Sequence, residues 1–349
     1  MFDYSEYERR WNVIADQREH DERKQLALAL EEERQGGKIG LTPMPKIESR
    51  PFRASLAVEA LPVFVSHSYR EPCWVYERKI PDPETGGTIV QVIRVGGEKV
   101  LTTAHQRCWY QLLHLWGEAG YPLVVDGRQT WGKLEVSAYK LVKHLRGDDS
   151  SHHYKQSRRL LRDLSSIPIR REEFYEDKVD DVEFTLLNGV EWNGCALDRR
   201  TRRPRPGGSS DVLVLFSNFI TESFLRRKVK ALMLQPYLRL TQTKGRSAEI
   251  APLLYPRLDY QLAGKNTYHR KLEPLIAELG LQPCSYKSKR KERIAPAIAA
   301  LDGMAILGEE YRLKVDLRLA RDESDWVLIA GKSPRKQLEL EPMSILGVQ

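Results

Sequence analysis

The chain has few cysteines and no long apolar run, and each absence excludes a class of protein. Its 349 residues include four cysteines, with no C-x-x-C pair to hold a metal ion and without the density of a secreted disulfide framework. No stretch approaches the roughly 18 apolar residues of a membrane-spanning helix, and the N-terminus lacks a signal-peptide pattern. We therefore expect a cytoplasmic protein that does not enter a membrane and whose thiols are reduced. These thiols belong to Cys73, Cys108, Cys195 and Cys284.

Signatures of catalysis are also missing. The sequence has no Walker A loop, no G-x-G-x-x-G motif behind a strand, no G-x-S-x-G motif and no H-E-x-x-H motif. His105 and His114 share a predicted helix, but more than two turns separate them, which is too far for one metal ion. The carboxylates at 180–181 and 309–310 show no spacing that singles out a general acid and base. We expect no enzymatic activity, no metal ion and no cofactor.

Positive charge is what the sequence does have. The formal net charge is +8 and the isoelectric point is about 9.2, while 41% of the residues are hydrophobic and 30% are charged. This composition predicts a globular protein with real cores and a polyanionic partner, either nucleic acid or an acidic membrane surface. A chain of this length indicates more than one domain.

The N-terminal segment is expected to lie apart from the domains. Residues 1–35 have the charge and periodicity of a helix that ends at a pair of glycines. Residues 36–71 are rich in proline and predict a linker that drapes over another part of the molecule. The run SLAVEALPVFV inside this linker is apolar enough to dock.

The remaining chain repeats one order of elements. After a hairpin at 73–97, helical patterns cover 101–120, 132–147 and 151–169, with a strand-like run at 121–127 and strand-like runs behind the third helix. Helical patterns then return, followed by a hairpin at 305–331. The later helical patterns cover 246–263, 267–281 and 286–303, and a helix at 219–240 would join the two sets.

This order is that of a helix-turn-helix with a β-hairpin wing. We therefore predict an α+β fold with two tandem winged-helix domains, at 72–220 and 221–335, before a tail at 336–349. Short echoes support the repeat: Lys-Leu-Glu at 133–135 and 271–273 opens each second helix, and Tyr-Lys at 154–155 and 286–287 opens each third helix.

The stretch SHHYKQSRRLLRDLSSIPI, residues 151–169, predicts an amphipathic third helix. At about 100° per residue, its apolar residues share one side and its cations share another, as a helix in the major groove of DNA requires. Arginines there could bind guanine edges, and polar residues of the first turns could meet bases or phosphates. The predicted DNA contacts on this helix are His152, His153, Lys155, Gln156, Arg158, Arg159 and Arg162.

Other interpretations of this helix stay open. A run of charge is often a solvated face, and basic amphipathic helices also bind membranes and partner helices. A metal site at the adjacent histidines is not favoured, because neighbouring side chains on a helix point apart and no cysteine or acidic cluster accompanies them.

Two further basic clusters favour DNA. The first lies in the loop at 193–208, where a cationic wing tip could follow phosphates or enter a narrow minor groove, unless it is only a solvated loop. This cluster consists of Arg199, Arg200, Arg202, Arg203 and Arg205. The second opens the third helix of the second domain, which Pro296 is expected to break or delay. It consists of Lys287, Lys289, Arg290, Lys291 and Arg293, of which Lys289, Arg290 and Arg293 are favoured for phosphate contact. A last group of cations, at 226–230, could contact DNA or pack between domains.

Several stretches together resemble the plasmid replication initiators, the Rep proteins with TrfA-like members. The resemblance covers roughly residues 72–330 and is carried by LTTAHQRCWYQLLHLWGEAG, KLEVSAYKLVKHL and HHYKQSRRLLRDLSSIPI in the first domain. In the second domain it is carried by GRSAEIAPLLYPRLDY, KLEPLIAELGL and KRKERIAPAIAALDGMAIL. These are patterns of spacing, and both Pro296 and the long arginine-rich loop depart from them.

The resemblance implies a bacterial, non-enzymatic protein that binds direct repeats in double-stranded DNA at a plasmid origin. Each third helix, at 153–162 and 287–293, would lie in the major groove. Several bound copies would open adjacent A·T-rich DNA and help recruit the host's replicative helicase, alongside the host initiator. Such proteins often form homodimers and bind the repeats as monomers.

Two other functions remain open. A winged-helix transcriptional regulator or partition protein would have the same domains but would leave the duplex closed. A strand-transferring nuclease would need a paired-histidine metal site, usually H-x-H, and a nucleophilic tyrosine. The sequence offers only the adjacent pair His152 and His153.

Overall fold

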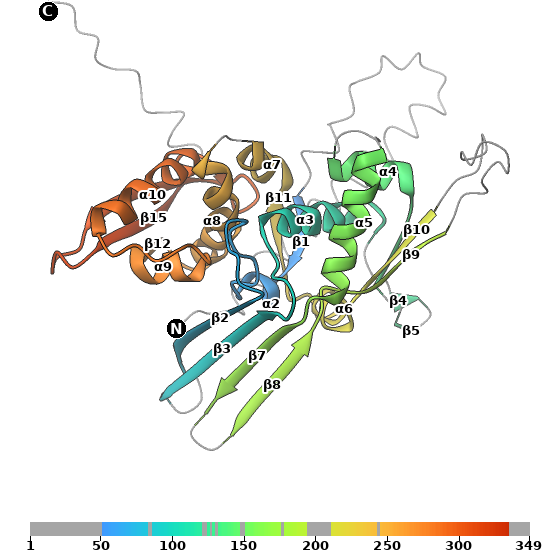
Figure 1. Ribbon diagram of the computed structural model, residues 1–349, viewed down its shortest axis with the longest axis horizontal. Coiled ribbons are helices and arrows are strands. Elements are labelled where there is room, and N and C mark those ends of the chain that lie inside the picture. The colour runs from blue at the N-terminus through green and yellow to red at the C-terminus, as the bar shows by residue number, and fades with distance from the viewer. Residues whose placement is uncertain are drawn as a thin grey trace, which may run out of the picture.

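The computed structural model describes residues 51–82, 86–120, 124–125, 128–129, 132–146, 151–175, 178–193, 211–242 and 245–334. The predicted N-terminal helix, the first part of the predicted linker, the arginine-rich loop and the C-terminal tail lie outside these residues. The described chain is a mixture of helices and antiparallel sheets, which confirms the predicted α+β class (Figure 1). Within it, no helix is long and apolar enough to cross a membrane.

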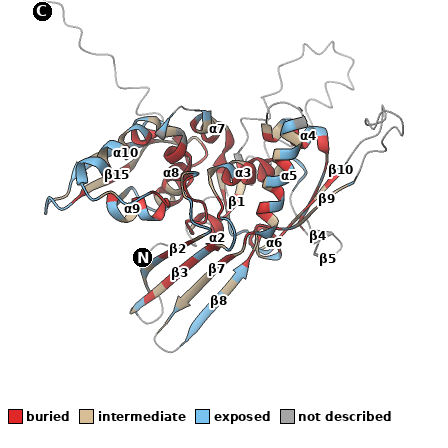
Figure 2. Cartoon of the chain, in the orientation of Figure 1, coloured by how far each residue is buried: buried red, intermediate tan, exposed pale blue. Residues whose placement is uncertain are grey.

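The first unit is built on helix α3 (Thr103–Glu118). Thr102 precedes it, and the Thr102 backbone N–H donates to Nδ1 of His105 at 3.0 Å, so the helix is capped within the predicted range 101–120. Trp109 and Trp116 are buried along the helix, which Figure 2 shows within the core. Strand β6 (Lys133–Ser137), helix α4 (Ala138–Arg146) and helix α5 (Ser151–Ser166) follow.

A three-stranded sheet completes this unit. Strands β9 (Leu187–Trp192) and β10 (Asp211–Phe216) form a hairpin, and β10 also pairs with β6, which gives the strand order β6-β10-β9. Strand β6, which precedes the second helix α4, is therefore paired with β10, the last strand of the hairpin that follows the third helix α5.

A four-stranded antiparallel sheet is attached to the first unit. Its strands are β2 (Cys73–Pro81), β3 (Thr88–Gly96), β7 (Ile169–Phe174) and β8 (Val179–Phe184), in that order. The sheet extends away from the helices toward the bottom of Figure 1. The predicted hairpin at 73–97 is present. The later strand-like run at 178–192 is divided, since its first half belongs to this sheet and its second half to the hairpin of the first unit.

The second unit repeats the order of the first. Helix α8 (Arg246–Ala263) is followed by strand β12 (Thr267–Lys271), helix α9 (Leu272–Glu278) and helix α10 (Lys287–Leu301). A sheet in the order β12-β15-β14-β13 completes it. The sheet's other strands are β13 (Ala305–Ile306), β14 (Tyr311–Leu319) and β15 (Trp326–Pro334). As in the first unit, the strand before the second helix pairs with the last strand of the hairpin.

The N-terminal part of the described chain joins the two units. Strand β1 (Pro51–Ser55) pairs with β11 (Val229–Met233), and helix α2 (Leu56–Glu59) follows β1. Phe52 and Val63 are 1% exposed. The apolar run docks as its composition suggested, and residues 51–65 belong to the folded core rather than to a linker.

The predicted joining helix at 219–240 is wrong. The segment instead forms α6 (Asn218–Leu225), β11 and α7 (Leu234–Gln242). Arg227 has a φ of 55°, a left-handed conformation that ends a helix, and the chain then pairs as a strand with β1. This partner is more than 170 residues away in the sequence, so no local pattern could reveal the strand.

The start of each second helix also differs from the prediction. Residues 133–137 form a strand in which Leu134 and Val136 are buried between exposed neighbours, the period-two pattern of a half-buried strand. The Lys-Leu-Glu echo therefore lies inside β6 in the first unit but across the end of β12 and the start of α9 in the second. Of the predicted strand at 121–127 the structure describes two residues, which form β4 (Val124–Val125) and pair with β5 (Arg128–Gln129) outside the three-stranded sheet.

Helix α10 continues through Pro296 to Leu301, so the predicted break does not occur. Proline removes one hydrogen bond from the helix. Ile294, Ala297 and Leu301 are fully buried and α10 packs against α8, so the apolar contacts on either side of the proline hold the helix together.

Candidate nucleic-acid interface

Helix α5 has the two sides that its sequence predicts. Leu161, Leu164 and Ser157 are fully buried, and the helix packs against α3, α4 and β9. On the other side, the lysine and the arginines are exposed to solvent. These exposed cations are Lys155, Arg158, Arg159 and Arg162. The amphipathic pattern therefore places a row of cations on the surface of a helix that is anchored by its opposite side.

These cations differ in what they contact. Among the described residues, the side chains of Lys155 and Arg162 have no hydrogen-bond or ion-pair partner. The guanidinium of Arg158 lies 4.7 Å from the centre of the Trp192 ring, and Nε of Arg159 lies 4.0 Å from Oδ2 of Asp163. Two of the four cations are therefore available to an external anion without giving up an internal partner.

A cleft of about 300 Å³ runs between α5 and the hairpin of the first unit. Arg158 and Arg162 line it from α5, and Trp192 and Val190 line it from β9. The guanidinium groups thus face an open space beside an aromatic ring. Sequence analysis did not single out Trp192, although its position directly before the arginine-rich loop was a signal that could have identified it. The arginines of that loop, at 199–205, lie outside the described residues.

Asp163 fixes α5 against the rest of the first unit. Its carboxylate, 5% exposed, lies 3.0 Å from Nζ of Lys99 and 3.3 Å from Nε2 of His105 on α3. Burial raises the pKa of Asp163, but the hydrogen bonds from His105 and Lys99 outweigh burial and hold the pKa below its ordinary value. Sequence analysis missed this anchor, which an acidic residue four positions after Arg159 could have signalled.

The two histidines that open α5 show no sign of a metal site. The His152 side chain contacts Gln156 one turn later, and the centres of the His152 and His153 rings are 5.8 Å apart. His152 is exposed, while His153 and Gln156 are half-buried. Within the described part of the chain, no cluster of histidine, cysteine or acidic side chains could hold a metal ion.

Helix α10 presents its cations differently. Arg290 is 8% exposed, and its guanidinium donates to Oδ1 of Asp325 at 2.9 Å and to the Cys284 carbonyl at 2.8 Å. Arg293 donates to the Gln282 carbonyl, also at 2.8 Å. These two arginines, which the sequence favoured for phosphate contact, therefore hold the helix to its own unit.

The lysines of α10 are exposed or half-buried and also have internal partners. Lys287 donates to the Glu323 carbonyl at 2.8 Å, and Lys289 lies 3.2 Å from Glu292 on the same helix. The Lys291 ammonium lies 3.8 Å from the centre of the Trp326 ring. Each of these contacts would have to compete with a phosphate for the same lysine.

The basic group at 226–230 divides into exposed and buried members. Arg226, Arg227 and Lys228 are exposed, whereas Lys230 is fully buried. The Lys230 ammonium donates to the Pro256 carbonyl at 2.7 Å and to Asp259 at 3.3 Å. Lys230 therefore packs between the two units, one of the two alternatives that the sequence left open.

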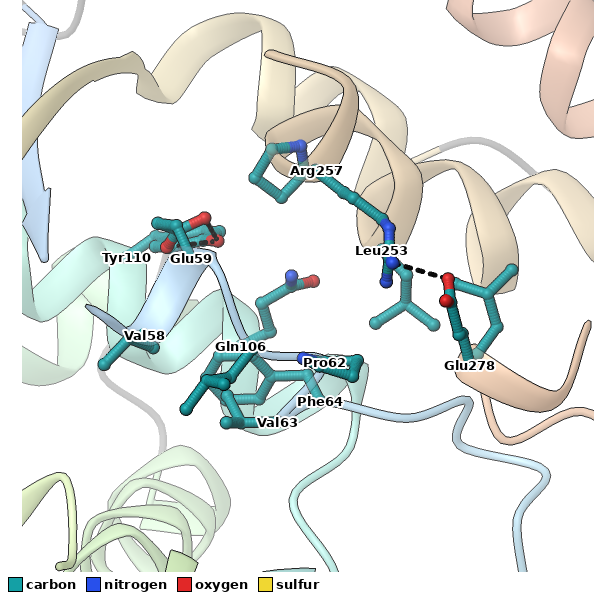
Figure 3. A pocket seen from close by; sticks show the side chains of 13 residues that line it. Val58, Glu59, Pro62, Val63, Phe64, Gln106, Tyr110, Leu253, Arg257 and Glu278 are labelled. Carbon is teal, nitrogen blue, oxygen red and sulfur yellow. Dashed lines mark hydrogen bonds and ion pairs between the residues drawn. The ribbon is translucent and has the colours of Figure 1, made fainter. Parts of the chain in front are cut away.

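A small cavity lies between the two units. Its volume is about 30 Å³, and it is lined by Glu59, Gln106, Tyr110, Arg257 and Glu278, among others (Figure 3). Figure 3 shows the Tyr110 hydroxyl bonded to Glu59 and Arg257 paired with Glu278, so the polar groups around the cavity bind one another.

Cys73, Cys108 and Cys284 are free thiols, as expected, and Cys195 lies outside the described residues. Cys284 is half-buried, and its Sγ lies 3.8 Å from Nη1 of Arg293.

Comparison with known proteins gives similar structures but no family. No known family model and no curated protein matches the sequence. Two crystal structures of domains 2 and 3 of RctB are similar to this chain, each at 12% sequence identity. One has a TM-score of 0.47 and covers 79% of this chain and 95% of the RctB chain. The other has a TM-score of 0.45 and covers 82% and 99%.

Proposed function

We propose that the protein is a sequence-specific, double-stranded DNA-binding replication initiator, and not an enzyme. The observation that carries this proposal is α5, an exposed row of cations on a helix whose other side is buried in the core. Such a helix fits the major groove, where arginine reads guanine through two hydrogen bonds.

The arrangement of strands supports a winged-helix interpretation of both units. In each, a helix, a strand and two further helices precede a hairpin whose last strand pairs with the first strand. In the proposal, α4 and α5 form the helix-turn-helix of the first unit, and β9 and β10 form its wing. Helices α9 and α10, with strands β14 and β15, have the corresponding roles in the second unit.

The resemblance of the sequence to plasmid replication initiators supplies the biological part of the proposal. Several copies would bind direct repeats at a plasmid-type origin in the bacterial cytoplasm and open the adjacent A·T-rich DNA. They would then help recruit the host's replicative helicase, with the host initiator. The monomer would be the form that binds the repeats, and the homodimer the form that does not.

The proposal is tested by selecting bound duplexes from a random-sequence pool and footprinting the full-length protein on the selected site. We expect a footprint about two major grooves long on one face of the DNA, since each of two units would occupy one groove. Binding of all duplexes with equal affinity, or of none, would contradict sequence-specific recognition.

Two further measurements separate this proposal from the other functions. Permanganate oxidation of thymines next to the bound site should increase, because an initiator opens the duplex there, whereas a transcriptional regulator or partition protein leaves it closed. Incubation of supercoiled DNA with the protein and a divalent metal ion should leave the DNA intact. Nicking or a covalent protein–DNA adduct would show that the protein is a nuclease.

A further inference from the structure

A second cleft lined by cations lies between α4 and α7, two helices that Figure 1 labels. Its volume is about 740 Å³, and it is open to solvent between the first unit and the segment that leads to the second. Its cationic side chains are Arg107, Lys140, Lys143, Arg146 and Arg239, whereas burial lowers the pKa of His144 to about 4 and leaves that imidazole neutral at pH 7. Among the described residues, no carboxylate lines this cleft.

The charges in this cleft are poorly balanced by the protein itself. The nearest described acidic partner is Glu118, outside the lining, which lies 3.2 Å from Nζ of Lys140. Lys143 donates to the hydroxyl of Tyr139, a neutral group, and Arg239 has no side-chain partner among the described residues. Like charges gathered in one place repel one another, and an anion bound between them removes this cost.

Buried polar atoms along the wall of the cleft also lack partners. Gln111 is only 3% exposed, and its Nε2 donates to the His144 carbonyl while its Oε1 has no hydrogen bond. Nε of Arg107, Nε of Arg146 and Nε2 of His144 are buried and equally unsatisfied. Burial, aided by the neighbouring charge of Arg107, lowers the pKa of Arg146. Three of these four atoms can donate a hydrogen bond, and a water molecule or an ion bound at the cleft could satisfy an unpartnered donor of this kind.

The cleft is continuous with the cationic surface of α5. Arg146, the last residue of α4, lines both this cleft and a neighbouring one of about 570 Å³. The neighbouring cleft is lined by Lys99 and by Gln156 and Arg159 of α5, and also by the carboxylates of Glu71, Glu98 and Asp163. The two clefts form one connected surface from α5, over the end of α4, to α7, and among the described residues its α7 side is the part that no carboxylate lines. Clefts that connect in this way fit an extended polyanion better than an isolated small anion.

We propose that the cleft between α4 and α7 binds the phosphodiester backbone of the DNA duplex whose bases α5 reads. This inference rests on the proposed function and adds to it a second contact, between the protein and the DNA phosphates on the side of the first unit that leads to the second unit. Because phosphates are alike at every sequence, this phosphate contact would raise the affinity for DNA without changing the sequence preference.

The test compares two double variants of the full-length protein. Lys143→Ala with Arg239→Ala removes two exposed cations of the cleft. The matched control, Lys79→Ala with Lys178→Ala, removes an exposed lysine on β2 and an exposed lysine directly before β8, and it causes the same change in net charge. Dissociation constants are measured from 0.05 to 0.3 M salt, on the selected duplex and on an unrelated one.

We expect the cleft variant to lose about two phosphate contacts. The slope of log K against log salt should then become less steep by about 1.8, and the affinity at 0.15 M salt should fall about 30-fold on both duplexes. The control variant should behave as the unmodified protein. Thermal unfolding checks that both variants remain folded.

Three outcomes would overturn the inference. If the cleft variant keeps the affinity and slope of the control, DNA does not occupy the cleft while the proposed function stands. If inorganic phosphate at constant ionic strength stabilises the unmodified protein but not the cleft variant, and DNA affinity is unchanged, the cleft binds a small anion instead. If the unmodified protein binds no duplex, the proposed function itself fails, and the inference with it.

Discussion

Helices α5 and α10 hold the same place in the two units, but their anchoring side chains carry opposite charges. Helix α5 supplies the acidic member of its buried contact, and α10 supplies the basic member. In the first unit the buried carboxylate, Asp163, belongs to the helix, and its partners, the Lys99 ammonium and the His105 imidazole, come from outside. In the second unit the buried cation, Arg290, belongs to the helix, and its partner Asp325 comes from the loop between β14 and β15. An acidic anchor leaves the cations of its helix available to a ligand, whereas a basic anchor uses one of them.

This difference gives the two helices different expected roles. Helix α5 needs no cation of its own for its anchor and presents Lys155 and Arg162 without internal partners among the described residues. Helix α10 uses Arg290 and Arg293 to hold its own unit together. We therefore propose that α5 supplies base recognition, while α10 contributes a weaker backbone contact through its lysines.

Removing the anchor of α10 should have the largest effect. Arg290→Ala leaves the buried Asp325 carboxylate without its charged partner, and the loss of one member of a buried pair typically costs about 3 to 5 kcal/mol. The free energy of unfolding from denaturant titration measures this loss. The conservative variant Asp325→Asn keeps an acceptor for Arg290 and should cost less. If Arg290→Ala leaves stability unchanged and weakens DNA binding, Arg290 contacts DNA as the cations of α5 are proposed to do. The contrast between the two helices then fails.

Removing the anchor of α5 should cost less. Asp163→Asn removes the charge of the carboxylate that accepts hydrogen bonds from Lys99 and His105, a loss of about 1.5 to 3 kcal/mol in the free energy of unfolding. Because the pKa of Asp163 is lowered by folding, the carboxylate stabilises the protein above the ordinary pKa of 3.8, and this contribution disappears as the pH falls through the folded pKa.

The free energy of unfolding, measured as a function of pH on the acid side, tests this effect. The unmodified protein should lose stability more steeply than Asp163→Asn below about pH 4, where the unfolded chain takes up the proton first. Parallel profiles would show that Asp163 contributes no charged anchor, and the two units would then differ less than their ion pairs suggest.

Changing a free cation of α5 should affect DNA and not stability. Arg162→Ala should cost about 1 to 3 kcal/mol of binding free energy if the arginine contacts a base, and preference should relax at one position of the site. Competition between the selected duplex and its single-base variants measures this change. Lys79→Ala, at an exposed lysine of β2 in the four-stranded sheet, is a control that removes the same charge and should leave affinity and preference unchanged. An equal loss on all duplexes would show that Arg162 contacts phosphate, which removes base recognition from this position.

The sequence predicted local features and missed those that depend on distant partners. The two sides of α5 follow from a rotation of about 100° per residue, so the exposure of Arg158 and the burial of Leu161 could be predicted. The repeated order of elements could also be read, because each helix and hairpin has its own period. The pairing of β1 with β11 could not be read, because its two strands lie far apart in the chain.

The same limit applies to the candidate site. Arg290 and Lys289 are neighbours in one basic run, and composition treats them alike. Only the fold brings Asp325 to one of them and leaves the other in solvent. Whether a cation is free depends on its three-dimensional neighbours, and for that reason a basic helix identifies a probable surface but not its individual contacts.

The smallest effect is expected at Lys289, which tests whether α10 touches DNA at all. Its ion pair with Glu292 is exposed and worth less than about 1 kcal/mol, so Lys289→Ala should leave the free energy of unfolding nearly unchanged. If Lys289 meets a phosphate, the slope of log K against log salt should become less steep by about 0.9, equally for the selected and the unrelated duplex. Glu292→Ala frees the same lysine from its partner and should strengthen binding slightly. An unchanged slope in both variants would exclude a phosphate contact at Lys289 and would sharpen the contrast between α5 and α10 further.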